Sequence, residues 1–263
     1  MKIFLLVLGL SALFSIYIIQ ANAAIDMAET EGIWLFDDGA GDMAEDSSGN
    51  NRHGTIEGNA QWTKDGKFGG ALELDGVDDE VVIIGYKGVG GNAPRTTVLW
   101  LRTTGPVNQR LVCWGANVNT NKYHIRVHDG PNTLRVETAG GQLYSTENPI
   151  TDGEWHHLAV VLPEGSTMCH DHLLYVDGQL QENTGGTNIG VDTDVTQNDV
   201  EIGFDKVISQ GVHVVGTIDE VAIFNVAMDE DEIRNIMLQG LSGSVLSVSS
   251  AGKLAIKWGE LKQ

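Results

Sequence analysis

The sequence has few basic residues, and this shortage limits the partners that the protein can bind. Lysine and arginine together number 16 against 36 aspartate and glutamate residues, which gives a formal net charge of −20. A surface this acidic repels the phosphates of nucleic acids and the headgroups of anionic membranes. We therefore expect neither of them as a partner. The acidic excess keeps the protein soluble and also suits divalent cations.

The motifs of several common enzyme classes are also absent. The chain contains no G-x-S-x-G, no H-E-x-x-H and no phosphate-binding glycine loop. EF-hand spacing is missing too, because the twelfth position of the stretch that begins at Asp192 is Gly203 and not glutamate. None of these classes is therefore indicated.

Only one long apolar run occurs, and it lies at the N-terminus. Lys2 precedes an almost unbroken apolar stretch over residues 3–19, and Ala21-Asn22-Ala23 then supplies small residues where a signal peptidase acts. We predict a signal peptide over residues 1–23 and export of the mature chain to a periplasm, the cell surface or the medium. An uncleaved anchor is the alternative, because the run just reaches membrane-spanning length. No second such run follows, so we expect no membrane insertion of the mature chain.

The sequence has only two cysteines, Cys113 and Cys169. An exported chain meets an oxidising compartment, in which these two residues can form a disulfide. The sequence by itself does not show that their Cα atoms lie within the required ~6 Å. We expect the bridge, and the alternative of two free thiols stays open.

Short apolar or alternating runs, separated by turn residues, fill the rest of the chain. Asp-Gly pairs stand between many of these runs, and they suit tight hairpin turns because both residues accept positive φ. Glycine is plentiful, with 33 residues, and proline is scarce, with five. The pattern predicts an all-β sandwich or barrel. The candidate strands are 32–37, 70–75, 80–84, 97–103, 110–115, 122–128, 133–138, 155–162, 170–176, 198–203 and 214–225.

One helix is predicted near the C-terminus. Residues 229–232 are all acidic and suit a first helical turn, where the helix dipole favours negative charge. Ile233 and Ile236 then recur on one face, and Gly240 suits the end of the helix. Residues 241–263 read as a Ser/Gly-rich spacer followed by a short tail that contains lysines and a tryptophan. This tail either packs on its own domain or serves as a docking element.

Five landmarks occur in a fixed order along the chain. They read GIWLFDDGAGDMAEDSSGNNRHGTIEG (32–58), WTKDGKFGGALELDGVDD (62–79), DGEWHHLAVV (152–161), LLYVDG (173–178) and GTIDEVAIFNVAMDEDEI (216–233). Together they resemble the laminin G-like (concanavalin A-like lectin/glucanase) jelly-roll family in its bacterial, secreted form. The resemblance implies one domain over residues 24–240, an all-β jelly roll of two antiparallel sheets with a short C-terminal helix. Within it, we expect the strand of Trp34 to pair with the strand Asp219–Phe224.

The same fold houses glucanases, whose catalytic carboxylates lie on one strand and face one cleft. The nearest candidates here are Glu73, Asp75 and the acidic residues 78–80. Gly76 and its turn interrupt the strand, so we expect that these carboxylates do not all line one cleft. We therefore expect a domain without catalytic activity.

A structural calcium ion is the metal chemistry that the sequence favours. Residues 45–51 mix carboxylates, amides and a glycine in an irregular segment, as calcium loops do. In family members that bind calcium, the corresponding loop lies close to the aspartate of the G-x-I-D-E motif. The resemblance therefore implies Asp46, Asn51 and Asp219 as ligands, with Asp37 and Asp78 in reserve. The alternative is that Asp46 and its neighbours form only turn hydrogen bonds.

Sugar sites combine exposed aromatic faces with polar groups beside them. Trp34, Trp62, Trp100 and Trp155 coincide with positions that the family keeps apolar for its core. The remaining candidates for ligand binding are Trp114, Tyr123, Tyr144, Arg126 and Asn117. Packing in the core would explain the same aromatic residues.

These observations predict a non-catalytic extracellular binding module with a carbohydrate as its ligand. The first alternative is a structural or adhesive surface protein that binds other extracellular proteins. The second is an enzyme that acts on polysaccharides. The fold does not decide between ligands, because it hosts many unrelated ones.

Overall fold

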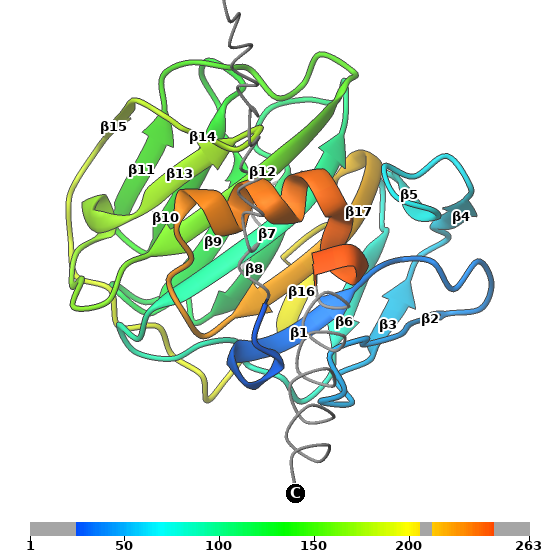
Figure 1. Cartoon of the computed structure of the whole chain (residues 1–263). Helices are drawn as coiled ribbons and strands as arrows, with labels where there is room; N and C mark the ends of the chain where they lie inside the picture. Colours follow the sequence, from blue (N-terminus) through cyan, green and yellow to red (C-terminus); the bar gives the residue numbers. More distant parts are fainter. Residues whose placement is uncertain (1–24, 206–211, 245–263) are drawn as a thin grey trace, which may run out of the picture.

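The chain folds into two stacked β-sheets with a helix on one outer side (Figure 1). The computed structural model describes residues 25–205 and 212–244. The predicted signal peptide, residues 1–23, lies outside the described residues, as does most of the predicted tail. Within the described ranges, no helix has the length and apolar character needed to cross a membrane.

An eight-stranded antiparallel sheet forms the middle layer. Its strand order is β14-β13-β12-β7-β17-β5-β4, and β1 also pairs with β17. β17 pairs with β5 through its first half and with β1 through its second half, where Trp34 lies opposite Val221. The predicted pairing of the first and last strands is confirmed. The strands are β1 Thr30–Trp34, β4 Gln61–Thr63, β5 Ala71–Asp75, β7 Arg95–Arg102, β12 Trp155–Leu162, β13 Leu173–Val176, β14 Gln179–Leu180 and β17 Val215–Phe224.

A nine-stranded antiparallel sheet packs against it and forms the other outer layer. Its order is β15-β11-β10-β9-β8-β16-β6-β3-β2. The strands are β2 Met43–Ala44, β3 Gly54–Glu57, β6 Glu80–Ile83, β8 Arg110–Gly115, β9 Lys122–Val127, β10 Leu134–Thr138, β11 Gly141–Ser145, β15 Asn183–Gly185 and β16 Val200–Ile202. Two short 3-10 turns, η1 Met27–Glu29 and η2 Cys169–Asp171, lie outside the sheets.

The main hydrophobic core lies between the two sheets. Successive side chains of a strand point to opposite faces, so every second residue enters this core. Tyr123, Ile125 and Val127 of β9 belong to it, and the residues between them therefore face outward. The same alternation in β10 buries Leu134 and Val136. The outer face of the nine-stranded sheet is consequently built from the polar residues of these strands.

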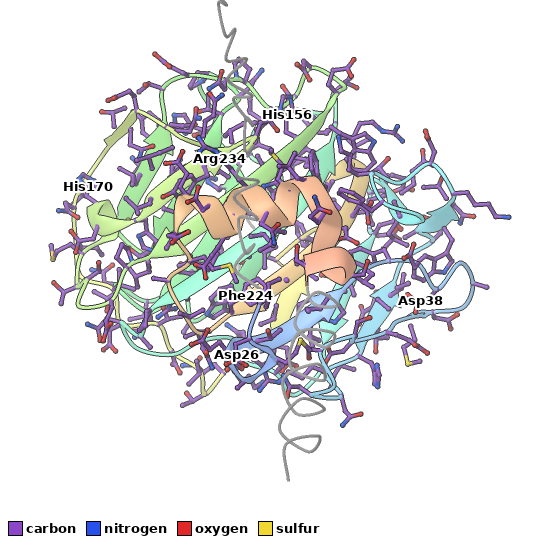
Figure 2. The ribbon with its side chains drawn as sticks, in the orientation of Figure 1. Asp26, Asp38, His156, His170, Phe224 and Arg234 are labelled. Carbon is purple, nitrogen blue, oxygen red and sulfur yellow. The ribbon has the colours of Figure 1, made fainter. Side chains whose placement is uncertain are left out.

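A helix covers the outer face of the eight-stranded sheet (Figure 1). Residues 230–244 are helical, and Gly240, which was predicted to end the helix, lies within this segment with a left-handed φ of 72°. Arg234, labelled in Figure 2, donates from Nε to the carbonyl oxygen of Gly178 at 3.1 Å and ties the helix to the β13–β14 turn. A second core fills the space between helix and sheet, and its members include Val98, Val161, Phe224, Ile233, Ile236 and Leu241.

The jelly-roll sandwich predicted from the sequence is confirmed. Each candidate strand overlaps an observed one, while the short strands β2, β3, β4, β14 and β15 and the edge-proximal β11 were not predicted. Residues 241–244 correct the expected boundary at residue 240. They continue the helical segment, and the amide of Leu241 donates to the carboxylate of Glu220. The folded domain therefore extends beyond Gly240.

The two cysteines are free and buried, so the expected disulfide is not formed. Cys113 lies between the core residues Val112 and Trp114 of β8, and its side chain therefore points to the outer face of the nine-stranded sheet. Cys169, at the start of η2, contacts Thr138, which shares the inner side of β10 with Val136. The sheet itself separates the two thiols.

Shortening a buried side chain of the helix should destabilise the domain. Ile236 is 1% exposed, whereas Leu238 on the same helix is 65% exposed. We expect Ile236→Ala to lower the free energy of unfolding by about 2–5 kcal/mol, because it opens a cavity in the second core. The control Leu238→Ala should change it by less than about 0.5 kcal/mol. Urea denaturation measures both, and equal effects would contradict the described packing.

Candidate functional site

The outer face of the nine-stranded sheet carries a row of cationic side chains. The register places Arg110 opposite Arg126, Arg126 opposite Arg135, and Arg135 opposite Tyr144. Residues directly opposite each other share a face, so β8, β9, β10 and β11 present these four side chains next to one another. Like charges in such positions destabilise a sheet, and the row therefore needs anionic partners.

These side chains line a hollow of about 410 Å³, which we call the basic hollow. Its volume falls in the range of about 300–1,000 Å³ that is typical of small-molecule sites. The lining comes from β8 to β11 and the loops next to them. It consists of Asn108, Arg110, Lys122, Arg126, His128, Asp129, Arg135, Glu137, Gln142 and Tyr144.

Glu137 is the anionic centre of the basic hollow. Its carboxylate contacts Lys122 Nζ, lies 3.2 Å from Arg126 Nε and accepts a hydrogen bond from Arg135 Nη2 at 2.9 Å. Arg110 Nη1 is 4.0 Å away. Burial by itself would raise the pKa of Glu137, but Lys122 and then the two arginines outweigh it and lower this pKa to about 2. Glu137 therefore stays ionised and holds the cations together.

Positive charge still exceeds negative charge in the basic hollow. Its lining holds one lysine and three arginines but only two carboxylates, those of Glu137 and Asp129. Asp129 lies 3.5 Å from Arg126 and 3.0 Å from Arg135. Burial, and after it the neighbouring Arg110 and Arg135, lower the pKa of Arg126 to about 10. Arg126 remains charged at neutral pH, so the hollow attracts anions.

An aromatic pair borders the basic hollow. Tyr144 stacks on His128, with ring centroids 3.8 Å apart and ring planes 17° apart. Burial, followed by Arg135, lowers the pKa of His128, which keeps the imidazole neutral at pH 7. Flat rings beside forked hydrogen-bond donors are the combination that sugar sites use. The structure thus brings two of the predicted ligand-binding residues, Tyr144 and Arg126, into one site.

Three other predicted ligand-binding residues lie elsewhere. Trp114 is 2% exposed and Tyr123 is fully buried, and their rings stack on each other in the main core with centroids 4.2 Å apart. Neither ring offers a face to a ligand, which corrects the prediction for both. Asn117 is exposed in the loop between β8 and β9 and does not line the basic hollow.

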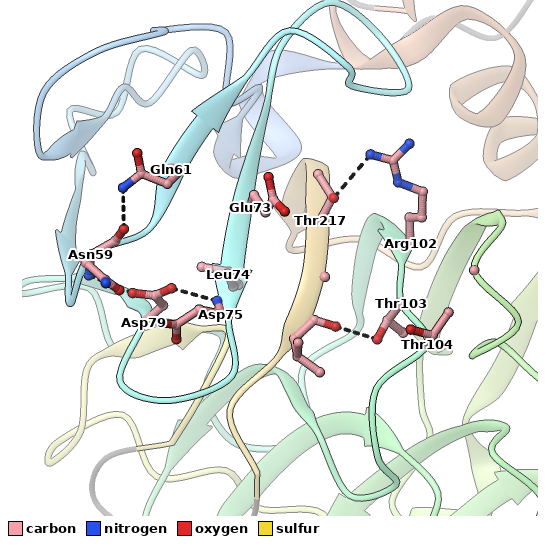
Figure 3. Close-up of a pocket in the computed structure, with 13 residues that line it drawn as sticks. Asn59, Gln61, Glu73, Leu74, Asp75, Asp79, Arg102, Thr103, Thr104 and Thr217 are labelled. Carbon is pink, nitrogen blue, oxygen red and sulfur yellow. Dashed lines mark hydrogen bonds between the residues drawn. The ribbon is translucent and has the colours of Figure 1, made fainter.

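A larger hollow of about 750 Å³ lies along β5, β7 and β17 (Figure 3). Glu73, Asp75 and Asp79 line it, whereas Asp78 and Glu80 do not, so the five carboxylates do not all line one cleft, as expected. Asp79 accepts hydrogen bonds from the backbone amides of Asn59 and Asp75, each at 2.7 Å, and so serves to hold the hairpin. No aromatic side chain is among the described residues that line this hollow, so it lacks a surface on which a sugar can stack.

Asp46, one of the expected calcium ligands, stabilises its own loop through hydrogen bonds. Its carboxylate accepts hydrogen bonds from the backbone amides of Ile33, Ser48 and Arg52 at 2.9–3.1 Å. Against the effect of burial, a hydrogen bond from the Ser48 side chain and then these backbone bonds lower the pKa of Asp46. They use most of the acceptor capacity of the carboxylate. The turn-forming alternative weighed for Asp46 therefore describes its contacts, and Asn51 next to this loop has a positive φ of 58°.

Asp219, the expected calcium ligand on β17, is buried, and only one of its two carboxylate oxygens accepts hydrogen bonds within the described ranges. Its Oδ2 accepts hydrogen bonds from the amides of Lys67 at 2.7 Å and Phe68 at 3.0 Å. Its Oδ1 is buried and has no hydrogen-bond partner within the described ranges. Burial raises the pKa of Asp219 to about 7. Asp46 and Asp219 share no hydrogen-bond partner among the contacts that hold them.

Most residues of the basic hollow were not predicted from the sequence. Arg110, Lys122, Arg135 and Glu137 attracted no interpretation, although Lys122, Arg135 and Glu137 alternate with apolar residues in their strands. The signal available in the sequence was the presence of charged residues in three consecutive candidate strands, which indicates a polar outer face. Only the register shows that they converge on one hollow.

The protein is thus an antiparallel β-sandwich with a polar hollow on one sheet face. Residues 75–234 match the family described as the concanavalin A-like lectin/glucanases superfamily. The match covers more than half of the chain, and the chain belongs to this superfamily. No protein among those with curated descriptions matches it.

Solved structures share the fold at low sequence identity. Domain 4 of AbnA, a GH43 extracellular arabinanase from Geobacillus stearothermophilus solved with arabinotriose, aligns with a TM-score of 0.59 and 20% identity over 80% of this chain and 98% of that one. The binding domain of Paraclostridial Mosquitocidal Protein 1 has a TM-score of 0.57 and 14% identity over 80% and 52%. Trypanosoma rangeli sialidase aligns with a TM-score of 0.57 and 15% identity, over 81% of this chain and 33% of the sialidase chain. The chain thus spans about half of the second protein and a third of the third.

The ionised Glu137 should make stability depend on acidic pH. Its pKa is about 2 in the folded protein against an ordinary value of 4.5. Its stabilising contribution is therefore complete above pH 4.5 and is lost as the pH falls toward 2. We expect Glu137→Gln to destabilise the protein by about 3–5 kcal/mol at pH 7, as breaking a buried charge pair does. Denaturation at several pH values should show that this difference shrinks below pH 4.5.

The control for this experiment is Glu230→Gln, which removes a carboxylate that contacts Arg234 on the exposed helix surface. Its effect should stay below about 1 kcal/mol at every pH. A Glu137→Gln effect that does not change with pH would contradict the role given to Glu137.

Proposed function

We propose that the protein is an exported, non-catalytic carbohydrate-binding module, and that its ligand is a glycan with a carboxylated sugar. The observation that carries this proposal is the excess of buried cations beside the Tyr144–His128 pair. The stacked rings provide a flat face for a sugar ring. Arg126 and Arg135 provide charged donors for the carboxylate.

Arginine suits this task because its planar guanidinium can donate two parallel hydrogen bonds to one carboxylate. A carboxylate in the basic hollow would join Glu137 and Asp129 in offsetting the repulsion between Arg110, Arg126 and Arg135. An uncharged sugar makes hydrogen bonds there but leaves that repulsion in place. The proposed ligand class follows from this difference.

The solved structures support a binding role. The AbnA domain was solved with arabinotriose, and the similar parts of the mosquitocidal protein and of a botulinum neurotoxin C/D mosaic are described as binding and receptor-binding domains. These descriptions apply to those proteins. For this chain, they favour binding over catalysis as the use of a shared fold.

The titration of the carboxylates also favours binding. Glycoside hydrolysis uses one carboxyl group with a raised pKa as the acid and a second, ionised one. Against the effect of burial, the cations of the basic hollow lower the pKa of Glu137, and a hydrogen bond to its own backbone, followed by Arg126 and Arg135, lowers the pKa of Asp129. Neither group can then act as an acid near neutral pH. The alternative, an enzyme that acts on polysaccharides, depends on Glu73 and Asp75 in the larger hollow. If the protein is such an enzyme, Glu73→Gln should abolish the release of reducing ends from the polysaccharide.

Calorimetry with two forms of one oligosaccharide tests the proposal. Oligogalacturonate and its methyl ester differ only in whether the carboxyl groups are charged. We expect the acid to bind at least about tenfold more tightly. Arg126→Gln should weaken binding of the acid about 10–100-fold, since a hydrogen bond to a charged group contributes about 1.5–3 kcal/mol. Tyr144→Ala should weaken binding of both forms, because the stacking face is lost.

The matched control is Arg234→Gln, which removes an arginine from the helix on the opposite side of the sandwich and should leave affinity unchanged. Near-ultraviolet circular dichroism shows whether each variant is folded. Equal affinity for acid and ester would refute the carboxylate preference. A glycan array without any binding would refute the carbohydrate proposal and favour the structural or adhesive alternative, with an extracellular protein as the partner.

We propose further that a structural calcium ion, when present, is held through Asp219. The buried Oδ1 without a hydrogen-bond partner is the acceptor that such an ion would complete. Asp46 and Asn51 were expected beside it, but the three amide bonds of Asp46 leave it little capacity. Calcium would supply charge that keeps the Asp219 carboxylate ionised.

Stability measured against pH tests this calcium proposal. The pKa of Asp219 is about 7 in the folded protein against an ordinary 3.8, so the stability that comes from its protonated form is lost as the pH rises from about 4 to 7. We expect this loss in EDTA and a smaller loss in the Asp219→Asn variant. Millimolar calcium should abolish the loss in the wild type. Identical melting curves with calcium and with EDTA would refute the calcium proposal.

A further inference from the structure

A second cluster of polar side chains lies on the outer face of the nine-stranded sheet. It consists of Cys113 on β8, His124 on β9 and Asp205 in the segment after β16. Each residue offers one ligand atom, and the three atoms lie within 4.8 Å of one another. All three side chains are buried, and none of them lines the basic hollow. The cluster is therefore a separate site.

The strand register accounts for this cluster. Cys113 lies opposite His124 on one side and opposite Glu201 of β16 on the other. Both Cys113 and His124 stand between core residues of their strands, so both point outward. Asp205 then approaches from the end of β16, where its Oδ2 lies 2.5 Å from Nε2 of His124. Three different elements thus bring a thiol, an imidazole and a carboxylate together.

The imidazole of His124 has an unused nitrogen. Nε2 faces Asp205, whereas Nδ1 is buried and has no hydrogen-bond partner in the part of the chain that the structure describes. A buried polar atom without a partner costs free energy, and such an atom calls for an explanation. A neutral imidazole is also the form that binds metals.

We propose that Cys113, His124 and Asp205 bind a zinc ion. Thiolate, imidazole and carboxylate are the three side-chain ligands that zinc takes in proteins. The sulfur ligand disfavours calcium and magnesium, which prefer sites made only of oxygen. On binding, the Cys113 thiol loses its proton to solvent and the thiolate forms the bond to zinc. The site is distinct from the proposed glycan and calcium sites and does not depend on them.

The charges around the cluster are compatible with a divalent cation. Burial raises the pKa of the Cys113 thiol well above its ordinary value, so the thiol is protonated until a cation binds. Asp205 and Glu201 act in the same direction, and Arg110 and Lys122 oppose them. The thiolate and the Asp205 carboxylate together offset the charge of the zinc ion. Glu201, which lies opposite Cys113 in the register, adds a further carboxylate on this face.

Cobalt substitution in the purified full chain tests this proposal, because Co²⁺ reports a sulfur ligand through a thiolate-to-metal charge-transfer band. We expect one equivalent of Co²⁺ to give this band and zinc to abolish it. Cys113→Ser should remove the band. Cys169→Ser is the matched control, since it removes the other buried cysteine on the inner side of the sheet, and it should retain the band. Asp205→Asn should lower zinc affinity at least about 10–100-fold, the effect of losing even an outer-shell partner.

A second measurement needs no variant and so does not depend on variant folding. X-ray absorption of the zinc-loaded wild type should show one sulfur scatterer at about 2.3 Å together with lighter scatterers at about 2.0–2.2 Å. A zinc spectrum without sulfur would overturn the proposal. So would a cobalt band that survives in Cys113→Ser or disappears in Cys169→Ser, and so would the absence of stoichiometric zinc binding by the wild type.

Discussion

The contact of Glu137 with the cations around it is the interaction on which the outer face of the nine-stranded sheet depends. Bringing several cations together out of water costs free energy through desolvation and mutual repulsion. Glu137 offsets part of that cost because it contacts Lys122, Arg126 and Arg135 at once. Glu137 and the more exposed Asp129 together carry fewer charges than the cations that line the basic hollow, so they do not neutralise them. The lining of the basic hollow therefore keeps more cations than carboxylates, and this excess is the basis of the anionic ligand proposed above.

The position of the C-terminal helix explains why this face is available for a ligand. The helix buries outward residues of the eight-stranded sheet, such as Val98 and Phe224, so the strands beneath it are apolar on both faces. In β12, Leu158–Leu162 are buried without interruption. β9 shows the opposite pattern, with core residues and polar residues in alternation. The pattern of the strands therefore already distinguishes the apolar face that the helix covers from the face that carries the polar residues.

The fold could be predicted from the sequence because its signals are local. Turn residues, alternation and the five landmarks each act over a few residues, and they indicated the strands and the pairing of Trp34. The basic hollow depends instead on register between strands. In β8, a bulge between Arg110 and Val112 buries Leu111 and still leaves Arg110 on the outer face. Simple alternation from Cys113 would have placed Arg110 inward, so no count along the strand predicts its position.

The aromatic candidates show the same limit. Tyr123 and Tyr144 both stand in strands that also contain polar residues, and this composition does not tell them apart. The two tyrosines differ in the side of the strand on which they lie. Tyr123 shares the inner side with Ile125, whereas Tyr144 follows the inward Leu143 and faces outward.

The prediction of the disulfide was wrong for a related reason. Cys113 and Cys169 lie on opposite sides of one sheet, and the sequence alone does not fix those sides.

A basic hollow in a protein of net charge −20 also bears on which acidic glycans it can accept. At physiological ionic strength, charges more than about 8 Å apart on a protein surface are largely screened from each other. A carboxylated sugar inside the hollow therefore experiences mainly the nearby cations. A long, uniformly charged polysaccharide would run beyond them and meet the acidic remainder of the surface at short range. For the proposed acidic glycan, the charge distribution thus favours a short or sparsely charged ligand, whose acidic group would enter the hollow while its neutral part would lie against Tyr144.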